Sequence, residues 1–428
     1  MNILMMTNTY KPFIGGVERS VETFKDRYLR RGHHVYIVTP EYKGATEHEP
    51  GIFRFPAIQN FNGSDFSVKL PVPGILMKKL EEFDPDIIHS HHPFLMGDTA
   101  LRVSASLNVP LVFTFHTFFE RYTHYVPGDS KPLRRFVAAL ATGYANLSDH
   151  VIAPSESVKN ILRERGVRSP MSVVPTGIDV GDFDHGDGSG FRKSLGLEEH
   201  AFVVGFVSRL APEKNITFLC RALSRFLRQK QSAHFIIVGT GPSEKAMRMI
   251  FEEEGVQSRV HFTGLLEGQG LTDAYHAMDV FAFTSHTETQ GIVIAEAMAA
   301  SVPVIALDAT GIREVIEDGR NGRLLFHENE DEFSEALIQV ADMDTHRRRE
   351  WSQQARKTAD EYSIERSVDK TLHIYERVSV RDRFVNGSVK ETPWQDTVRR
   401  IHAEWELLMN TARATGAAFS GNNDPKNL

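Results

Sequence analysis

The feature that most constrains the fold is an alternation of short strand patterns with helical patterns that runs twice along the chain. Strands spaced by helices favour parallel sheets whose two faces are both covered. We therefore predict an α/β protein with two doubly wound, Rossmann-like domains. The apolar or β-branched strand patterns lie at 3–7, 35–39, 87–89, 111–114 and 150–153, and then at 202–207, 235–238, 260–263, 280–284 and 303–307.

The length of 428 residues agrees with this repetition, because a single hydrophobic core rarely serves more than about 250–300 residues. A turn-rich stretch from Pro175 to Gly190 interrupts the alternation and is typical of an interdomain linker. The predicted division is an N-terminal domain (1–180), a linker (181–198), a C-terminal domain (199–362), a helix crossing back to the N-terminal domain (363–380) and a helical or partly disordered extension (381–428).

Composition excludes several classes of protein. The single cysteine rules out an intramolecular disulfide framework and fits a reducing cytoplasm. No stretch reaches the roughly 20 apolar residues that span a bilayer, and the N-terminus reads as a strand rather than a signal peptide. The first 180 residues carry 20 Lys and Arg against 18 Asp and Glu, and the remainder carries 29 against 38. Because a nucleic-acid binder usually has a stronger basic stripe, we expect no nucleic-acid partner.

Two cations, Arg209 and Lys214, follow directly after the strand pattern at 202–207. Loops at the carboxyl ends of strands are where open α/β sheets bind ligands. Fixed cations at this position are suited to neutralising a diphosphate. The alternative is that both side chains are ordinary solvated surface charges.

The strongest local signal is the segment TETQGIVIAEAM at 287–298. A helix is predicted to begin near Gly291, and the amides of its first turn can hold a phosphate. Glu288 in the preceding loop and Glu296 inside the helix can accept hydrogen bonds from sugar and ribose hydroxyls, because charge-assisted bonds are the stronger ones. The alternative is that Glu288 caps the helix and Glu296 is a surface charge.

A glycine pair, Gly15-Gly16, stands between the first strand and the first helix. Glycines at such a turn allow backbone amides to approach a phosphate, and the helix N-terminus adds partial positive charge. The spacing is not the G-x-G-x-x-G of dinucleotide-binding proteins, which disfavours an oxidoreductase. A plain strand-to-helix turn is the competing interpretation.

The run His89-Ser90-His91-His92 raises the question of a metal site. His89 and His91 would share one face of a strand, but no cysteine or carboxylate lies nearby in the sequence, and Pro93 turns the chain. We therefore expect no metal.

A segment rich in aromatic and basic residues follows residue 116. Arg134 and Arg135 lie near the start of an amphipathic helix, where cations oppose the helix dipole and an external anion is a reasonable partner. Basic residues beside aromatics are what an interfacial membrane contact uses. The competing interpretation is a core-packing helix with two solvated arginines. The predicted acceptor or membrane residues are Phe118, Phe119, Tyr122, Tyr125, Arg134 and Arg135.

Taken in order, these motifs resemble the retaining GT-B glycosyltransferases of group 1 type, over nearly the whole of residues 1–375. The shared features are Gly15-Gly16, Arg209 with Lys214, the strand ends at 238–242 and 262–264, and Glu288-x7-Glu296. The resemblance implies two Rossmann-like domains facing across a cleft that binds a nucleotide-sugar, without a metal or other cofactor.

The resemblance also implies roles for individual residues. The catalytic set would be His116, beside the anomeric centre, with Arg209, Lys214 and Glu288. Seen in isolation, a histidine at a strand end is usually structural, so the role of His116 depends on the resemblance. The donor-binding set would be Gly15, Gly16, Arg209, Lys214, Gly239, Gly241, Leu265, Glu288, Gln290, Gly291, Ile292, Val293 and Glu296.

The segments 116–125 and 287–291 look most like those of the bacterial 1,2-diacylglycerol 3-glucosyltransferases. In many relatives a Gly-Phe pair precedes the helix where Thr289-Gln290 stand here. The implied activity is retaining transfer of glucose from UDP-glucose to diacylglycerol, by a cytoplasmic enzyme in peripheral contact with the anionic inner face of the membrane. Two alternatives are a same-fold transferase with a soluble, phospho-sugar or GDP-mannose substrate, and a non-catalytic nucleotide-sugar-binding protein.

Overall fold

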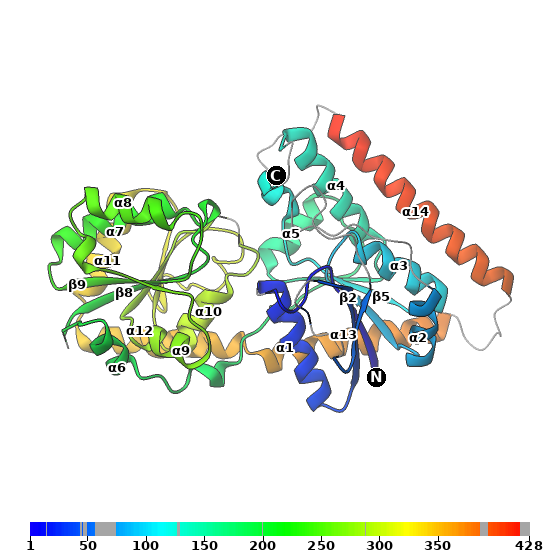
Figure 1. Ribbon diagram of the computed structural model, residues 1–428, viewed down its shortest axis with the longest axis horizontal. Helices are drawn as coiled ribbons and strands as arrows, with labels where there is room; N and C mark the ends of the chain where they lie inside the picture. Colours follow the sequence, from blue (N-terminus) through cyan, green and yellow to red (C-terminus); the bar gives the residue numbers. More distant parts are fainter. Residues whose placement is uncertain are drawn as a thin grey trace. The chain divides into compact units, whose positions relative to one another are not determined.

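The strands assemble into two separate parallel sheets, each within its own compact unit (Figure 1). The first unit comprises residues 1–175 and 367–428, and the second comprises residues 176–366. Each unit is described by itself. The computed structural model describes residues 1–13, 15–42, 45, 49–55, 74–125, 129–198, 200–286, 288–385 and 393–419.

The first unit has a seven-stranded sheet of order β3-β2-β1-β4-β5-β6-β7. Its strands are β1 (Asn2–Met6), β2 (His34–Pro40), β3 (Ile52–Phe55), β4 (Ile87–Ser90), β5 (Leu111–Thr114), β6 (His150–Ala153) and β7 (Met171–Val173). Its helices are α1 (Gly16–Arg30), α2 (Gly74–Phe83), α3 (Met96–Leu107), the 3-10 helix η2 (Phe119–Tyr125), α4 (Lys131–Asn146), α5 (Glu156–Glu164), α13 (Ile364–Val385) and α14 (Pro393–Phe419).

The second unit has a six-stranded sheet of order β10-β9-β8-β11-β12-β13. Its strands are β8 (Phe202–Val207), β9 (Ala233–Val238), β10 (Val260–Gly264), β11 (Val280–Phe283), β12 (Val304–Leu307) and β13 (Gly322–Leu325). Its helices are η3 (Val180–Phe183), α6 (Gly188–Ser194), η4 (Pro212–Lys214), α7 (Ile216–Gln229), α8 (Glu244–Glu253), η5 (Gln257–Arg259), α9 (Gly268–His276), α10 (Ile292–Ala299), α11 (Glu330–Ala341) and α12 (Thr345–Glu361).

The predicted fold class is therefore confirmed. All described strand pairings in both sheets are parallel, and helices cover both faces (Figure 1). The central strand β8 is buried at every position, as expected for a strand covered on both sides. Its sequence is a continuous apolar run, FVVGFV, and this is why the strand can be predicted from the sequence alone.

Three strands escaped the sequence pattern, and all three lie at sheet edges. They are β3, β7 and β13. β7 is partly exposed at each of its three residues, and β3 at three of its four. For β3 and β7 this exposure explains why no apolar run marks them. β13 is buried at three of its four positions, so its short, arginine-containing sequence GRLL, and not exposure, conceals it.

The segment predicted as a linker, 181–198, is folded onto the second unit. It forms η3 and α6, and Arg192 donates a 2.9 Å hydrogen bond to Asp279 Oδ2 and another, of 2.8 Å, to the Ala277 carbonyl. At the other end, α13 carries the chain back into the first unit, where Tyr375 is fully buried. Of the C-terminal extension, 386–392 and 420–428 lie outside the described residues.

The strand orders define one switch point in each sheet, where successive connections leave in opposite directions. It falls between β1 and β4 in the first unit and between β8 and β11 in the second. Ligands of open α/β sheets bind beyond the carboxyl ends of the strands at such points. These two loop clusters are therefore where a functional site is expected.

Candidate functional site

At the switch point of the second unit, the loops after β8 and β11 bring together two residues that are 74 positions apart. Lys214 Nζ donates a 2.5 Å hydrogen bond to Glu288 Oε1, and both side chains are mostly buried. An ion pair shielded from solvent interacts more strongly than an exposed one. The structure thus joins two of the predicted catalytic residues in one charged contact.

The loop that carries Lys214 is fixed by hydrogen bonds from the neighbouring strand end. Thr284 Oγ1 donates to the Lys214 carbonyl at 3.0 Å, and Ser285 Oγ donates to the Glu213 carbonyl at 3.4 Å. Asn215 ends the turn in the left-handed conformation, with φ of 54°. These contacts, which the sequence did not reveal, hold the cation before any ligand arrives.

Arg209 occupies the same loop and is more exposed. Its guanidinium pairs with the carboxylate of Glu213, which is itself almost completely buried. About half of the Arg209 side chain faces solvent. The predicted pair of cations therefore consists of one buried and one accessible charge on a single loop.

Gly239 and Gly241 lie behind this loop. A Cβ on Gly239 would overlap the Ser208 carbonyl oxygen, and one on Gly241 would overlap that of Leu210. The Leu210 amide also donates to the Thr240 carbonyl at 2.9 Å. The two glycines, predicted to contact the donor, allow the β9 loop to press against the Arg209 loop and so fix its position.

Helix α10 begins as the sequence predicted, directly after Gly291. That glycine is in the left-handed conformation, with φ of 69°, and no side chain caps the helix. The first-turn amides of Ile292 and Val293 have no partner within the helix, as at any helix N-terminus. They are the groups that an anion can use.

Gln290 and Glu296 have internal partners. Gln290 Oε1 accepts a 2.5 Å hydrogen bond from the Thr176 amide, where the chain enters the second unit. Glu296 is buried, and its Oε2 accepts a 2.8 Å bond from the Tyr275 hydroxyl. The interpretation of Glu296 as a surface charge is therefore wrong.

Two further residues of the motifs remain. Leu265, also predicted to contact the donor, is exposed in the loop after the edge strand β10. Thr287 lies outside the described residues.

At the switch point of the first unit, the strand ends carry histidines. His91, after β4, and His116, after β5, share a hydrogen bond of 2.9 Å between Nδ1 and Nε2, and their rings are stacked. Burial lowers the pKa of His116 to about 4 and that of His91 well below its usual range. Both imidazoles are therefore neutral near pH 7.

The other two histidines are tied into the core. His89 Nδ1 lies 2.5 Å from the Tyr375 hydroxyl, and its Nε2 lies 2.7 Å from Thr114 Oγ1. His92 Nδ1 accepts a 3.1 Å bond from the Asn8 amide. Within the described part of the chain, no group of three His, Cys, Asp or Glu side chains is arranged to hold a metal. The contact from α13 to His89 was not visible in the sequence.

Gly15 and Gly16 form the start of α1, with Gly15 as an extended N-cap. A Cβ built on Gly16 would meet nothing within 4 Å. This glycine is therefore not required by local packing, unlike Gly239 and Gly241. Open space in front of a helix N-terminus is compatible with the predicted phosphate contact.

The aromatic and basic segment differs from its prediction in one main respect. Phe118 is buried beneath the guanidinium groups of Arg121 and Arg165, so it is a core residue and not an exposed membrane contact. Phe119 packs against Phe94 at a ring distance of 4.8 Å, and Tyr122 is partly buried. The side chain of Tyr125 lies outside the described residues.

The two arginines at the start of α4 both have partners within the protein. Arg134 makes a two-pronged contact with Asp129, at 3.1 and 2.6 Å. Arg135 donates a 2.9 Å bond to the Ala418 carbonyl near the end of α14. Arg134 therefore has a counter-ion within the protein. Arg135 has a neutral carbonyl as its partner, and its buried Nε makes no hydrogen bond to the described residues, so an external anion stays a prediction for Arg135. In the part of the chain that the structure describes, no helix is both long and apolar enough to cross a bilayer.

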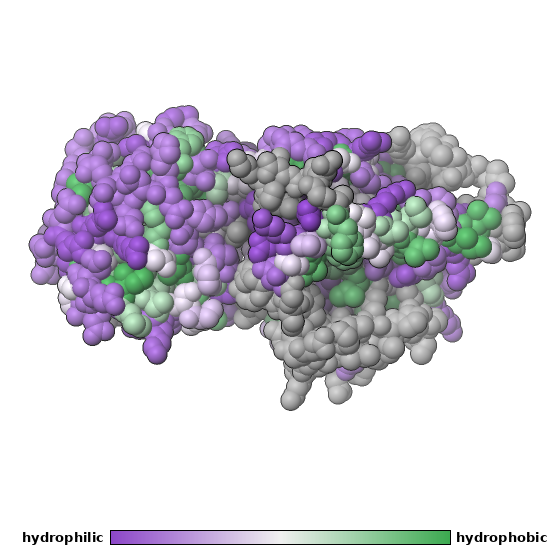
Figure 2. All heavy atoms as spheres, turned by 90° about the horizontal axis from the view of Figure 1, so that it is seen from above, coloured by the Kyte–Doolittle hydropathy of each residue, from purple (hydrophilic) through white to green (hydrophobic). Residues whose placement is uncertain are grey.

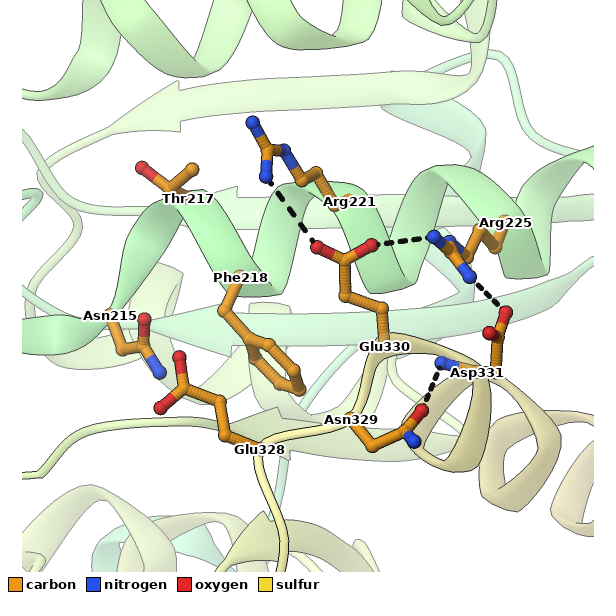
Figure 3. Close-up of a pocket in the computed structure, with 9 residues that line it drawn as sticks. All are labelled: Asn215, Thr217, Phe218, Arg221, Arg225, Glu328, Asn329, Glu330 and Asp331. Atoms are coloured by element: carbon orange, nitrogen blue, oxygen red, sulfur yellow. Dashed lines mark hydrogen bonds and ion pairs between the residues drawn. The ribbon is translucent and has the colours of Figure 1, made fainter.

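A separate polar pocket of about 410 Å³ lies at the start of α7 (Figure 3). Arg225 bonds both Glu330, at 2.8 Å, and Asp331, and Arg221 lies 3.7 Å from Glu330. Charges that neutralise one another in this way tie α7 to α11. The pocket was not predicted, and we assign its charged residues a structural role.

The comparisons with known proteins agree with this architecture. Residues 14–182 match the family described as Glycosyltransferase Family 4, and residues 189–358 match Glycosyl transferases group 1. The Anabaena protein Alr3699/HepE, solved in complex with UDP, superimposes with a TM-score of 0.69 at 23% identity, covering 88% of this chain and 100% of that one. These matches define the class: the fold is GT-B.

Two proteins named alpha-monoglucosyldiacylglycerol synthase are similar over most of their length. The one from Acholeplasma laidlawii is 30% identical, covering 79% of this chain and 88% of the relative, and the one from Streptococcus pneumoniae is 29% identical, covering 81% and 80%. A GDP-mannose-dependent alpha-mannosyltransferase from Corynebacterium glutamicum is 28% identical, covering 76% of each chain. The chain belongs to the group 1 glycosyltransferases.

Proposed function

We propose that this glycosyltransferase moves glucose from UDP-glucose to the free hydroxyl of diacylglycerol, with retention of the anomeric configuration. The observation that carries the proposal is the Lys214–Glu288 contact at the switch point of the second unit. The names of the two synthases that are about 30% identical support the sugar and the acceptor. The UDP complex of the structural neighbour supports a uridine nucleotide.

On the donor side, the second unit would hold the diphosphate. Lys214 and Arg209 supply positive charge, and the amides of Ile292 and Val293 add oriented dipoles at the start of α10. When the phosphate takes Lys214 as its partner, the Glu288 carboxylate is released to accept hydrogen bonds from sugar hydroxyls. Stabilising the charge that develops on the leaving diphosphate is then the main catalytic device.

No metal is needed in this scheme, because side chains and helix amides perform the neutralisation that a divalent cation would otherwise supply. Activity that persists in excess chelator is the expected result. A loss of activity that added magnesium or manganese restores would contradict this part of the proposal.

On the acceptor side, the first unit would contribute a neutral imidazole at His116. A neutral ring beside the anomeric carbon can make a hydrogen bond without repelling positive charge that develops on the sugar. None of the carboxylates in the motifs is placed as a covalent nucleophile like that of retaining hydrolases. We propose instead that a phosphate oxygen of the donor takes the proton of the acceptor hydroxyl.

The membrane location follows from the acceptor. Diacylglycerol is confined to lipid, so the enzyme must work at a bilayer surface, and we propose peripheral contact with the anionic cytoplasmic face. Phe118 is buried, and Arg134 is paired with Asp129. Among the described side chains, Phe119, Tyr122 and Arg135 remain candidates for this contact.

The deciding experiment is a transfer assay with UDP-glucose, UDP-galactose and GDP-mannose, each offered with diacylglycerol in mixed micelles. We expect glucosyl-diacylglycerol from UDP-glucose, with the α configuration established by NMR of the product. No transfer to diacylglycerol from any donor would refute the acceptor, and an inverted product would refute retention.

A second candidate is GDP-mannose-dependent mannosyl transfer, which the similarity to the Corynebacterium glutamicum protein favours. The same assay distinguishes the two, because mannosyl products would appear only with GDP-mannose. A soluble or phospho-sugar acceptor would show itself as donor turnover in the absence of micelles.

A further inference from the structure

Helix α14, in the C-terminal extension, packs on the first unit through only one of its faces (Figure 1). The buried positions on this inner face are Ala403, Leu407, Asn410, Ala414 and Ala418. Asn410 Nδ2 donates a 3.1 Å bond to the Leu140 carbonyl in α4, and a Cβ on Gly143 would overlap the Asn410 side chain. The helix is thus closely seated on α4.

The same helix is held against α3 at its other end. Arg102 contacts Glu404 through two nitrogens, at 2.5 and 3.0 Å, and Arg399 Nε donates a 3.1 Å bond to the Ala105 carbonyl. With both α3 and α4 beneath it, α14 has a fixed orientation. The face that it turns outward is therefore a defined surface of the first unit.

The outward face is apolar. Ile401, Trp405 and Leu408 are 62%, 57% and 60% exposed, and Phe419 is 80% exposed. Figure 2 shows apolar side chains gathered along the face of the molecule that carries this helix. We call this surface the outer stripe, made of Val398, Ile401, Trp405, Leu408, Ala412 and Phe419.

The residues of the outer stripe are spaced as in the line of contact between the two helices of a coiled coil. From Val398 to Phe419 its positions, completed by the exposed Thr415, are separated alternately by three and four residues. This period of 3.5 is the pattern by which one helix pairs with another, whereas a helix lying in a membrane interface has a broader apolar arc and many basic residues. Helix α14 carries three arginines and three acidic residues, so it has no excess positive charge.

The size of the stripe also suits a second protein. Large side chains exposed to this degree leave on the order of 500–600 Å² of apolar surface on each chain. Two such stripes in contact would bury about 1,100 Å² in total, near the lower limit of about 1,200 Å² for stable protein interfaces. Flanking contacts add to this area when two helices pack.

We propose that the outer stripe of α14 binds the same stripe of a second copy of this chain, with the two helices antiparallel. In that arrangement Trp405 faces Leu408 of the partner, Ile401 faces Ala412, and Val398 faces Thr415. The same register places Phe419 over the first turn of the partner's α14, so the area estimate includes a contact there. On each side of the central Trp405–Leu408 contacts, the large side chain of Ile401 then packs against the small side chain of Ala412. A parallel pair would instead place Trp405 on itself and leave a gap at Ala412. A two-fold axis makes the antiparallel contact self-complementary.

The first test is sedimentation of the full chain over a range of concentrations. We expect the unchanged protein to form a dimer, and Leu408→Glu to weaken the dimer by about 100-fold or more, because a carboxylate would be buried at the centre of the contact. The matched control is Arg413→Glu, an exposed position on the same helix but outside the stripe. Its dimer should be unchanged, and both variants should keep the parent's circular dichroism spectrum, since neither side chain is in the core. The melting temperature should fall only for Leu408→Glu, because dissociation removes the stabilisation that the dimer contact adds.

The second test fixes the direction of the pair by disulfide formation. Protein with Ile401→Cys mixed with protein carrying Ala412→Cys should cross-link, whereas Ile401→Cys alone should not. The native cysteine at 220 is fully buried and does not compete. Cross-linking of Ile401→Cys alone would overturn the antiparallel arrangement in favour of a parallel one.

A monomer at all concentrations would overturn the proposal. If that monomer bound liposomes of phosphatidylcholine and phosphatidylglycerol, and Leu408→Glu abolished this binding, the outer stripe would be a membrane contact instead. A dimer unaffected by Leu408→Glu would equally overturn it, by placing the interface elsewhere. None of these readouts depends on transferase activity, so they remain informative whichever sugar or acceptor the enzyme uses.

Discussion

The two units share one architecture but differ in the chemistry at their switch points. In the second unit the loops after β8 and β11 hold opposite charges, joined in the contact of Lys214 with Glu288. In the first unit the loops after β4 and β5 hold imidazoles, and burial keeps His91 and His116 uncharged. Neither switch point of the described chain has the chemistry of the other.

This difference matches two different tasks. A diphosphate needs positive charge and oriented amides, which a charged, partly buried loop supplies. A sugar carbon that gains positive charge, and a hydroxyl that attacks it, are better served by a neutral polar group. In the proposed reaction, the fold would thus divide donor and acceptor chemistry between its two units without altering either sheet.

The largest expected effect on turnover comes from removing a charged side chain at the switch point of the second unit. Lys214→Ala should lower the turnover number by about 10³-fold, because a preorganised contact to the developing charge on the diphosphate is lost. Glu288→Ala should have a comparable effect through the sugar hydroxyls. Steady-state kinetics at saturating donor measure both.

The control for these variants is an ion pair of the same unit away from its switch point. Arg225→Ala removes the contacts to Glu330 and Asp331 beside the pocket of Figure 3, and we expect turnover within twofold of the parent. If Lys214→Ala and Arg225→Ala had equal effects, the distinction between switch-point and structural charges would be lost.

The next largest effect is expected in the first unit. His116→Ala should lower turnover by about 10²-fold, in the range of single polar groups that act in the transition state. Because burial lowers its pKa to about 4, His116 gains its proton only as the pH falls toward 4. The rate should therefore be level between pH 6 and 8 and decline only well below the usual histidine pKa of about 6.5.

The pH profile separates this role from a structural one. A His116→Asn variant keeps a hydrogen-bonding group but cannot be protonated in this range, so its residual activity should lose the acid decline. A rate that halves near pH 6.5 in the parent enzyme would show that the ring is charged in solution and would break the contrast between the two units.

The sequence predicted the central strands and the class of fold for a physical reason. Strands covered on both faces, such as β8, need unbroken apolar runs, and these runs are visible without knowledge of any contact. The edge strands β3, β7 and β13 have no such runs, so their short mixed sequences could not be told from loops. Strand order, which decides where the switch points lie, depends on long-range pairing that no local pattern records.

The candidate site was predictable where a residue follows directly from a strand or begins a helix. Lys214 and Gly291 belong to this group, since their positions depend on local turns. The partners of buried polar groups were not predictable, because Tyr375 is 286 residues from His89 and Gln290 is 114 residues from Thr176. Burial was the other hidden quantity: the aromatic pattern did not distinguish the core residue Phe118 from a surface one.

A smaller effect is expected on the free energy of unfolding, when one glycine in each unit is replaced by alanine. Gly241→Ala should destabilise the second unit by about 1–3 kcal/mol, because its Cβ would overlap the Leu210 carbonyl. Gly16→Ala should leave stability unchanged or slightly higher, because nothing lies within 4 Å and alanine favours a helix. Thermal unfolding of both variants measures this contrast.

The same pair of variants tests the proposed phosphate contact of Gly16. If the N-terminus of α1 approaches the donor, the added methyl group of Gly16→Ala should raise the Michaelis constant for UDP-glucose while the melting temperature stays constant. An unchanged Michaelis constant would remove Gly16 from the donor site and leave the first unit without a contact to phosphate.

The smallest effect is expected where the two units are alike, at exposed ion pairs far from the switch points. Arg134 contacts Asp129 in the first unit, and Arg248 contacts Glu244 in the second; both contacts involve two nitrogens, and both arginines are about half exposed. Exposed pairs of this kind contribute only about 0.2–1 kcal/mol. Arg134→Ala and Arg248→Ala should therefore lower the melting temperature by the same small amount.

Liposome flotation adds a second criterion for the same two variants. Because Asp129 already neutralises Arg134, binding to anionic vesicles should change by less than twofold in either variant. A selective loss with Arg134→Ala would mean that the first unit, and not only its lipid substrate, is drawn to anionic membranes through this cation.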